Sequence, residues 1–448
     1  MDTDTGHTLS RLPAGSRRGF LRATGSAFAA LAASGCVARG QVQESMGLAP
    51  GYGGLKPDPA GLLDLPEGFS YRVLSRMGDA MDDGGTVPDN GDGMGCIALA
   101  GGKLALIRNH ELMPDKDAGG PIARGYDRLA DGDYLSGGTT TLILDAQTLA
   151  IERQFRSLGG TIRNCAGGVA PWGSWISCEE FVANPGSTLG KKHGYCFEVP
   201  ASAGEPVDPV PLKAMGRFNH EAVAFDPATG IVYETEDRED GLLYRFIPDV
   251  PGKLAEGGKL QALALESGKD SRNWNGVDVQ TGEWLSARWV DIANPDSDED
   301  DLRMQGAALG ATLFARGEGI HMGDGELYFC CTSGGAARLG QVFRLRPMAG
   351  GPDMLQLFFE STSPAQFNYG DNLTVGPNGH LVVCEDQYTD VVDNHLRGIT
   401  PAGAVYPLGR LRLQTELAGA CFSPDGKTMF VNAFSPTMTL AITGPWAG

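Results

Sequence analysis

Short apolar runs that follow glycine-containing turns recur along the chain from about residue 100 to its end. Each run contains aliphatic, β-branched or aromatic residues, and most runs end in a polar or acidic cluster. Runs of this kind after tight turns predict β-strands. The copies occupy residues 101–111, 171–180, 226–237, 323–332, 376–386 and 423–432.

The repeat predicts a β-propeller. A second strand-like run follows several copies, as at residues 241–246 and 341–345. The last three copies begin at Gly323, Gly376 and Ser423, so they are 53 and 47 residues apart, an interval typical of a four-stranded blade. We therefore expect an all-β fold, a six-bladed β-propeller with inserted loops, one of them the polar stretch around residues 267–301. A large β-sandwich with accidental similarity between turns is the alternative.

Composition supports a large, turn-rich domain and limits the partners. The chain has 65 glycines and 27 prolines among 448 residues, and 42% of its residues are hydrophobic. Its formal net charge of −19 repels nucleic acid and anionic lipid, so neither is expected as a partner. The excess of acids either serves solubility or supplies oxygen ligands for hard cations.

The N-terminal region predicts export. Residues 16–22, which include Arg17 and Arg18, fit the twin-arginine signal pattern, and the apolar run at 27–33 is too short to span a bilayer. Residues 33–36 resemble a lipoprotein cleavage box that ends at Cys36; simple cleavage and release is the alternative.

These features give the expected organisation of the chain. Residues 1–36 form a twin-arginine signal segment, residues 37–58 a linker and residues 59–448 a single propeller domain. We expect the twin-arginine translocation machinery as a partner, a periplasmic or envelope location, and membrane contact only through a lipid on Cys36. Because a closed propeller has little need of partners, we expect a monomer.

Eight cysteines follow Cys36, and their spacing lacks the repeated C-x₂-C pairs of a structural zinc site. Most are flanked by strand-forming residues and are expected to be small buried hydrophobes. Cys178 is the exception, because Glu179 and Glu180 follow it directly.

Acids at equivalent points of the repeat are expected to converge on the channel of the propeller. Those at the ends of the runs are Glu111, Glu179 or Glu180, Glu236 or Asp237, and Glu385 or Asp386, and Glu221 and Glu318 stand just before a run. Close carboxylates repel one another by several kcal/mol unless cations lie among them. Oxygen-only pockets suit calcium, and a thiolate such as that of Cys178 suits a transition metal. Taken one at a time, the same acids could be ordinary turn or surface residues.

Residues 161–168 and 171–180 closely resemble the hallmark stretch of the PhoX alkaline phosphatase family. The resemblance continues through residues 109–111, 220–221, 235–237, 384–386, 422–428 and 442–446, so that it covers about Pro59 to Trp446. It implies a six-bladed propeller that hydrolyses phosphate esters, uses an iron–calcium cluster and is exported by the twin-arginine route.

Carried over residue by residue, the resemblance implies roles for individual side chains. Cys178 would be an iron ligand, and Glu180, Glu236 and Glu385 would be among the cluster carboxylates, with Glu111, Glu221 and Glu318 as further members. Arg163 and Arg397 are candidates for holding the phosphate on position alone, because each lies in a loop near these motifs and guanidinium matches phosphate in a bidentate way.

The sequence therefore predicts a metal-dependent phosphoester hydrolase that acts on small phosphoesters. Two alternatives use the same architecture. One is a calcium-dependent propeller lactonase or esterase, which has no use for the thiol of Cys178; the other is a non-catalytic calcium-binding propeller of the envelope.

Overall fold

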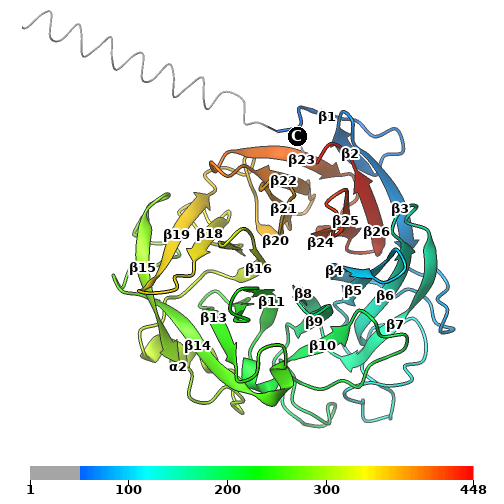
Figure 1. The fold of residues 1–448 in the computed structure, drawn as a ribbon, viewed down its shortest axis with the longest axis horizontal. Helices are drawn as coiled ribbons and strands as arrows, with labels where there is room; N and C mark the ends of the chain where they lie inside the picture. Colours follow the sequence, from blue (N-terminus) through cyan, green and yellow to red (C-terminus); the bar gives the residue numbers. More distant parts are fainter. Residues whose placement is uncertain (1–50, 447–448) are drawn as a thin grey trace, which may run out of the picture. The chain divides into compact units, whose positions relative to one another are not determined.

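The computed structural model describes residues 51–446, and nearly all regular structure in this range is β-strand. Antiparallel strands form sheets arranged around a common centre (Figure 1). The described part has one α-helix, α2 (Leu302–Ala308), and two 3-10 turns, Lys213–Met215 and Leu254–Glu256. The prediction of an all-β propeller is confirmed; the count of six blades stays a prediction.

The first two sheets are simple up-and-down arrays. One contains β4 (Gly91–Leu99), β5 (Lys103–His110), β6 (Gly137–Asp145) and β7 (Ile151–Thr161). The next contains β8 (Asn164–Ala170), β9 (Ser174–Glu179) and β10 (Cys196–Pro200).

Two further up-and-down runs are joined at their outer edges into one nine-stranded sheet. The first run is β11 (His220–Phe225), β12 (Val232–Glu236), β13 (Leu243–Pro248), β14 (Gly258–Leu265) and β15 (Trp284–Asp291). The second is β16 (Gly317–Met322), β17 (Leu327–Cys331), β18 (Gln341–Arg346) and β19 (Asp353–Glu360). Strand β15 pairs with β19, so the stretch expected as a polar insertion supplies the strand that links the two runs.

N-terminal strands complete the last two sheets. The first of these holds β20 (Gly370–Val375), β21 (Leu381–Glu385), β22 (His395–Ile399) and β23 (Val405–Leu411), to which β2 (Leu63–Pro66) and β1 (Leu55–Lys56) are added. The second holds β24 (Leu417–Phe422), β25 (Thr428–Ala433) and β26 (Met438–Thr443), with β3 (Ser70–Arg76) as its outer strand. The pairing of β3 with β26 closes the ring with the two ends of the propeller.

The linker predicted for residues 37–58 therefore has its last residues in the propeller, since β1 pairs with β2 and Tyr52 donates a hydrogen bond to the carbonyl of Trp446 at 3.1 Å. The signal segment, the start of the linker and Cys36 lie outside the described residues. Between residues 51 and 446, no helix is long and apolar enough to cross a membrane.

An inner ring of strands surrounds the centre, and each strand contacts the next around the circle. Its members are β4, β8, β11, β16, β20 and β24, and β24 contacts β4 (Figure 1). The apolar runs of the sequence repeat form β5, β9, β12, β17, β21 and β25, which lie second from the centre. The sequence repeat therefore marks the second strand of each sheet and not the strand that lines the channel.

The inner strands lack an apolar pattern because they are crowded against one another. A Cβ atom at Gly168 would lie 2.0 Å from the carbonyl oxygen of Val223, and one at Gly319 would lie 2.3 Å from the backbone nitrogen of Leu373. Small residues are required at such close approaches, so the inner strands are poor in the large residues that indicate strands in a sequence.

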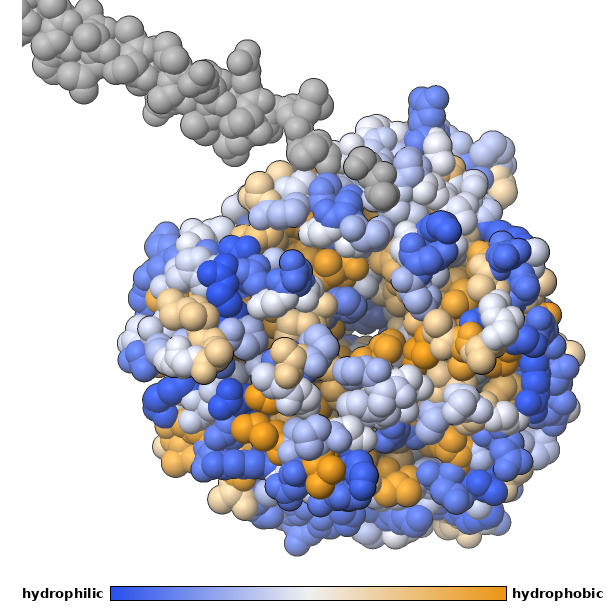
Figure 2. Space-filling model, in the orientation of Figure 1, coloured by the Kyte–Doolittle hydropathy of each residue, from blue (hydrophilic) through white to orange (hydrophobic). Residues whose placement is uncertain are grey.

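Apolar side chains fill the spaces between neighbouring sheets, as in packed β-sheets generally. Ile176 of β9 and Val223 of β11 pack between the sheet β8–β10 and the strands β11–β15. Phe329 of β17 packs between the strands β11–β15 and β16–β19. The face in Figure 2 is hollowed at its centre, where hydrophobic and hydrophilic residues both border the hollow. The sheets thus form a rigid frame around a central channel.

Candidate metal centre

Eight carboxylates and one thiol come together at one end of the inner ring. They form four overlapping groups, in each of which the ligand atoms lie within 4.8 Å of one another. The groups are Asp92–Glu111–Cys165, Cys165–Glu180–Glu221, Glu221–Glu318–Asp371 and Asp371–Asp386–Glu416. Three residues, Cys165, Glu221 and Asp371, each belong to two groups. The nine residues therefore form one connected set of potential metal ligands.

Interruptions of strand pairing place the ligands of the inner strands. Pairing shifts at Gly91, Asn164, His220, Gly317 and Gly370, the first paired residues of five inner strands. The residue after each shift is Asp92, Cys165, Glu221, Glu318 and Asp371, respectively. A β-bulge turns a side chain away from its regular direction, and here each one carries a ligand group. Glu416 comes directly before β24.

In three sheets, the strand second from the centre is followed directly by an acid of the metal centre. Glu111, Glu180 and Asp386 directly follow β5, β9 and β21 and belong to the groups. Asp237 holds the same position after β12, where its carboxylate binds Arg316. The structure therefore brings together the predicted residues Glu111, Glu180, Glu221, Glu318 and Asp386, with Asp237 next to Glu318 through Arg316.

Burial and mutual repulsion strongly oppose ionisation of this centre. Burial raises the pKa of Glu221 well above its ordinary value, and the charges of Asp371, Glu180 and Asp92 add to the rise. Burial and then Asp386 raise the pKa of Asp371 to about 7. At an effective dielectric constant of 20, two charges 4.8 Å apart repel by about 3 kcal/mol. Several ionised carboxylates can therefore persist at neutral pH only when cations neutralise them.

The residues present fit such cations. Glu221 is completely buried, yet neither of its carboxylate oxygens has a hydrogen-bond partner among the described residues. Buried polar atoms are nearly always paired, and a cation would provide the missing partner. Carboxylate oxygens suit calcium, and the thiol of Cys165, which donates to Asp92 at 3.3 Å, gives the centre one soft ligand.

Two arginines at equivalent positions border the acids. Arg163 stands two residues before Cys165, and its side chain pairs with Glu111 at 2.6 Å and with Glu180 at 3.0 Å. Arg316 stands two residues before Glu318, and it pairs with that residue at 2.9 Å and with Asp237 at 2.8 Å. Both arginines have positive φ, 48° and 57°, a strained conformation that often occurs at functional sites.

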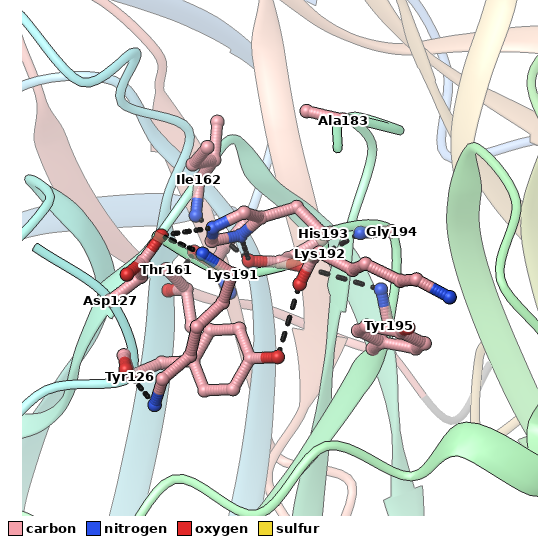
Figure 3. Close-up of polar contacts among 12 residues, drawn as sticks. Tyr126, Asp127, Thr161, Ile162, Ala183, Lys191, Lys192, His193, Gly194 and Tyr195 are labelled. Atoms are coloured by element: carbon pink, nitrogen blue, oxygen red, sulfur yellow. Dashed lines mark hydrogen bonds and ion pairs between the residues drawn. The ribbon is translucent and has the colours of Figure 1, made fainter. Parts of the chain in front are cut away.

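Glu179 serves to position the loop of Arg163. Its Oε1 accepts a hydrogen bond from the backbone nitrogen of Ile162 at 3.0 Å and lies 2.7 Å from Nδ1 of His193. The other ring nitrogen of His193 lies 3.2 Å from Asp127 (Figure 3). The expected placement of Glu179 among the channel acids therefore does not occur; adjacent residues of a strand face opposite sides.

The corresponding residues of two other sheets are also bound within their own sheets. Glu236 accepts hydrogen bonds from the Tyr244 hydroxyl at 2.9 Å and from the backbone nitrogen of Leu242 at 3.2 Å. Glu385 accepts from Nε of Arg397 at 2.7 Å, so these two residues bind each other. Glu179, Glu236 and Glu385 lie outside the acidic groups, so these three predicted residues are not part of the centre.

Cys178 also lies outside the acidic groups. Its side chain points into the core between two sheets, where its sulfur lies 3.5 Å from that of Cys196. Asp92, Cys165, Asp371 and Glu416 were not anticipated from the sequence, although all four belong to the centre.

Beyond the acids, the channel becomes apolar. A cavity of about 480 Å³ follows along the inner strands and is lined by residues such as Met94, Val223, Ile320 and Leu373. The fold and the acidic groups together define a β-propeller with a candidate multi-metal centre at one end of its channel.

A family model described as Alkaline phosphatase PhoX matches residues 50–149 and 131–437. The chain therefore belongs to the PhoX family of alkaline phosphatases, and with it to the hydrolases of phosphoric esters. No curated protein sequence gives a significant match to the chain.

The solved structure of a PhoX protein shares the fold of this chain. Pseudomonas fluorescens PhoX in complex with vanadate, a transition state analogue, is 18% identical with a TM-score of 0.70, over 86% of this chain and 96% of that one. The gluconolactonase XC5397 from Xanthomonas campestris is 13% identical with a TM-score of 0.38, over 88% and 98% of the respective chains.

Proposed function

We propose that the chain is an exported, metal-dependent phosphatase whose site is the acidic end of the channel, loaded with calcium and iron. The observation that carries this proposal is the chain of shared carboxylates around Glu221, whose buried oxygens have no partner among the described residues. Membership of the family supplies the reaction class. Cys165 takes the place of Cys178 as the thiolate ligand, because Cys165 lies within two of the acidic groups.

The donor chemistry divides the centre. Glu221, Glu318, Asp371, Asp386 and Glu416 offer only oxygen and would hold calcium. Cys165, with Asp92, Glu111 and Glu180 around it, would hold iron. When bound, these cations supply Lewis acidity toward the phosphate oxygens.

Arg163 and Arg316 are the cationic side chains that would orient the substrate. Their side chains are 36% and 21% exposed, so both can reach a ligand in the channel mouth. Carboxylates on one edge hold each guanidinium in place while other N–H groups stay available to phosphate oxygens. Arg397 is only 8% exposed and is held by Glu385, so we propose Arg316 in its place.

The proposal also includes the remaining expectations about export, blade number and oligomeric state. Residues 16–22 support twin-arginine export to the periplasm or envelope, with Cys36 as the candidate lipid anchor. The six contacting inner strands support six blades, and a closed ring supports a monomer.

A matched pair of variants tests the metal centre. Glu221→Gln should lower the calcium content and reduce turnover of p-nitrophenyl phosphate on the order of 100-fold, since losing only a hydrogen-bond partner of a metal ligand already costs 10–100-fold. Glu236→Gln, also a buried glutamate but outside the acidic groups, should keep both. Greater losses in Glu236→Gln would contradict this site, and full turnover by metal-free protein would contradict metal dependence.

A further inference from the structure

A second group of metal-binding residue types lies in the core, apart from the channel acids. Cys178 on β9 and Cys196 on β10 are directly paired in register, and their sulfurs lie 3.5 Å apart. The sulfur of Cys196 lies 3.4 Å from Nδ1 of His220 on β11. The ligand atoms of these three residues lie within 4.8 Å of one another, and the group shares no residue with the acidic groups.

Glu234 on β12 lies beside this group. Its Oε2 lies 3.4 Å from Nδ1 of His220, so the imidazole nitrogen has a sulfur on one side and a carboxylate on the other. Three neighbouring strands from two sheets thus direct one potential ligand each toward the same point, and the carboxylate of Glu234 lies next to the imidazole.

The orientation of His220 suits a ligand. Its Nε2 lies 3.1 Å from the carbonyl oxygen of Gly216, which can only accept a hydrogen bond. That contact places the proton of the neutral ring on Nε2, so Nδ1 presents its lone pair to Cys196 and Glu234. Metal-binding histidines commonly have their second nitrogen held in this way.

The burial of Glu234 is an independent indication of a cation-binding site. The residue is completely buried, and neither of its carboxylate oxygens has a hydrogen-bond partner among the described residues. Burial raises the pKa of this carboxyl well above its ordinary value, and Cys178 adds to the rise. An unpaired buried carboxyl is costly, and a cation would remove that cost.

We propose that Cys178, Cys196, His220 and Glu234 form a structural zinc site. Ordinary zinc–ligand lengths and tetrahedral angles give separations of about 3.8 Å for sulfur–sulfur, about 3.6 Å for sulfur–nitrogen and about 3.4 Å for nitrogen–oxygen. The corresponding distances here are 3.5, 3.4 and 3.4 Å.

The surroundings favour a structural rather than a catalytic zinc. All four residues are completely buried, and the ring of Phe218 stacks on that of His220 with 3.6 Å between centroids. Four protein ligands leave no open position for water or substrate. Two thiolates exclude calcium as the preferred occupant. The zinc would tie β9 and β10 to β11 and β12 across the boundary between two sheets.

Metal analysis of the purified full chain tests the site directly. Protein prepared without chelator should contain about one zinc ion per chain in addition to the channel metals. Cys196→Ser and Glu234→Gln should lose that zinc and retain calcium. Cys331→Ala removes another completely buried thiol outside the group and should keep the zinc. Wild-type protein that folds with no zinc, or with a disulfide between Cys178 and Cys196, would overturn the proposal.

Thermal stability supplies a test that does not depend on metal counting. With zinc bound, Glu234→Gln removes a ligand and should lower the melting temperature by several degrees. Without zinc, the same change removes an unpaired buried acid and should leave the melting temperature unchanged or higher, which would overturn the site. Cobalt added during refolding should give thiolate-to-metal absorption in wild-type protein and lose it in Cys196→Ser.

Discussion

Nε of Arg163 lies 2.6 Å from Oε1 of Glu111, and Nη2 of the same guanidinium lies 3.0 Å from Glu180. Glu111 follows β5 and Glu180 follows β9, so Arg163 binds acids from two different sheets. Among the described residues, Arg397 forms an ion pair only with Glu385 of its own sheet. On our proposal, this difference distinguishes an arginine that contacts substrate from one that stabilises its own sheet.

Replacing Arg163 by lysine should impair catalysis more than folding. Lysine cannot bind two carboxylates and a phosphate through one planar group, so kcat/KM for p-nitrophenyl phosphate should fall about 10- to 100-fold. Steady-state kinetics measure the loss, and melting curves should remain close to those of the wild type. In Arg397→Lys the pattern should reverse, with stability lowered by about 1–3 kcal/mol and kcat/KM of the folded fraction retained. Equal kinetic losses in the two variants would argue against the distinction.

Removal of calcium should make stability depend on pH. The folded-state pKa of Asp371 is raised to about 7, above the value of about 3.9 for an unfolded chain. The stability that the protonated Asp371 carboxyl contributes to the folded state is therefore complete below pH ~4, and it is lost as pH rises through ~7. Melting temperatures in EGTA should fall between pH 5 and 8, and excess calcium should suppress this fall. Identical pH profiles with and without EGTA would refute calcium binding by these carboxylates.

His193 should stabilise the fold on the acidic side of its titration. Burial lowers the pKa of His193, but the charges and hydrogen bonds of Glu179 and Asp127 outweigh burial, and the net pKa is raised. The protonated ring contributes fully below the unfolded value of about 6.5, and this contribution disappears as pH rises through the folded value. The difference in unfolding free energy between wild type and His193→Gln, measured in urea with calcium present, should shrink from pH 6 to pH 9. A difference that grows with pH would contradict the assignment.

Export should depend on the paired arginines of the N-terminal segment. Arg17→Lys together with Arg18→Lys should leave the protein in the cytoplasm, because the twin-arginine machinery recognises that pair. Cell fractionation followed by immunoblotting measures the distribution. Arg11→Lys, a change of the same type outside the pair, should leave export unaltered. Normal export of the double variant would remove the twin-arginine hypothesis.

The sequence was informative about the second strands and misleading about the inner ones. Runs such as residues 104–107 and 381–383 carry large apolar side chains because they pack between sheets. The inner strands carry glycine and alanine at close approaches, so no run indicated Asp92 or Asp371. The ligand of an inner strand precedes the ligand that follows the second strand by a short interval. The interval is 19 residues from Asp92 to Glu111 and 15 residues from Cys165 to Glu180.

The choice between neighbouring residues could not be made from the repeat. Glu179 and Glu180 are adjacent, yet only Glu180 belongs to the acidic groups. The direction of each side chain depends on where strand pairing ends, and in the inner strands it depends on the bulge. Cys178 illustrates the same difficulty, because its sulfur lies beside that of Cys196 and not among the acidic groups.

The pairing of β3 with β26 has a consequence for biosynthesis. The two strands are separated by more than 360 residues, with Arg76 opposite Met438, so the ring cannot close before β26 has been synthesised. Long-range pairing of this kind folds slowly. A nascent chain that stops short of β26 therefore leaves the edge of β3 open to association with other chains.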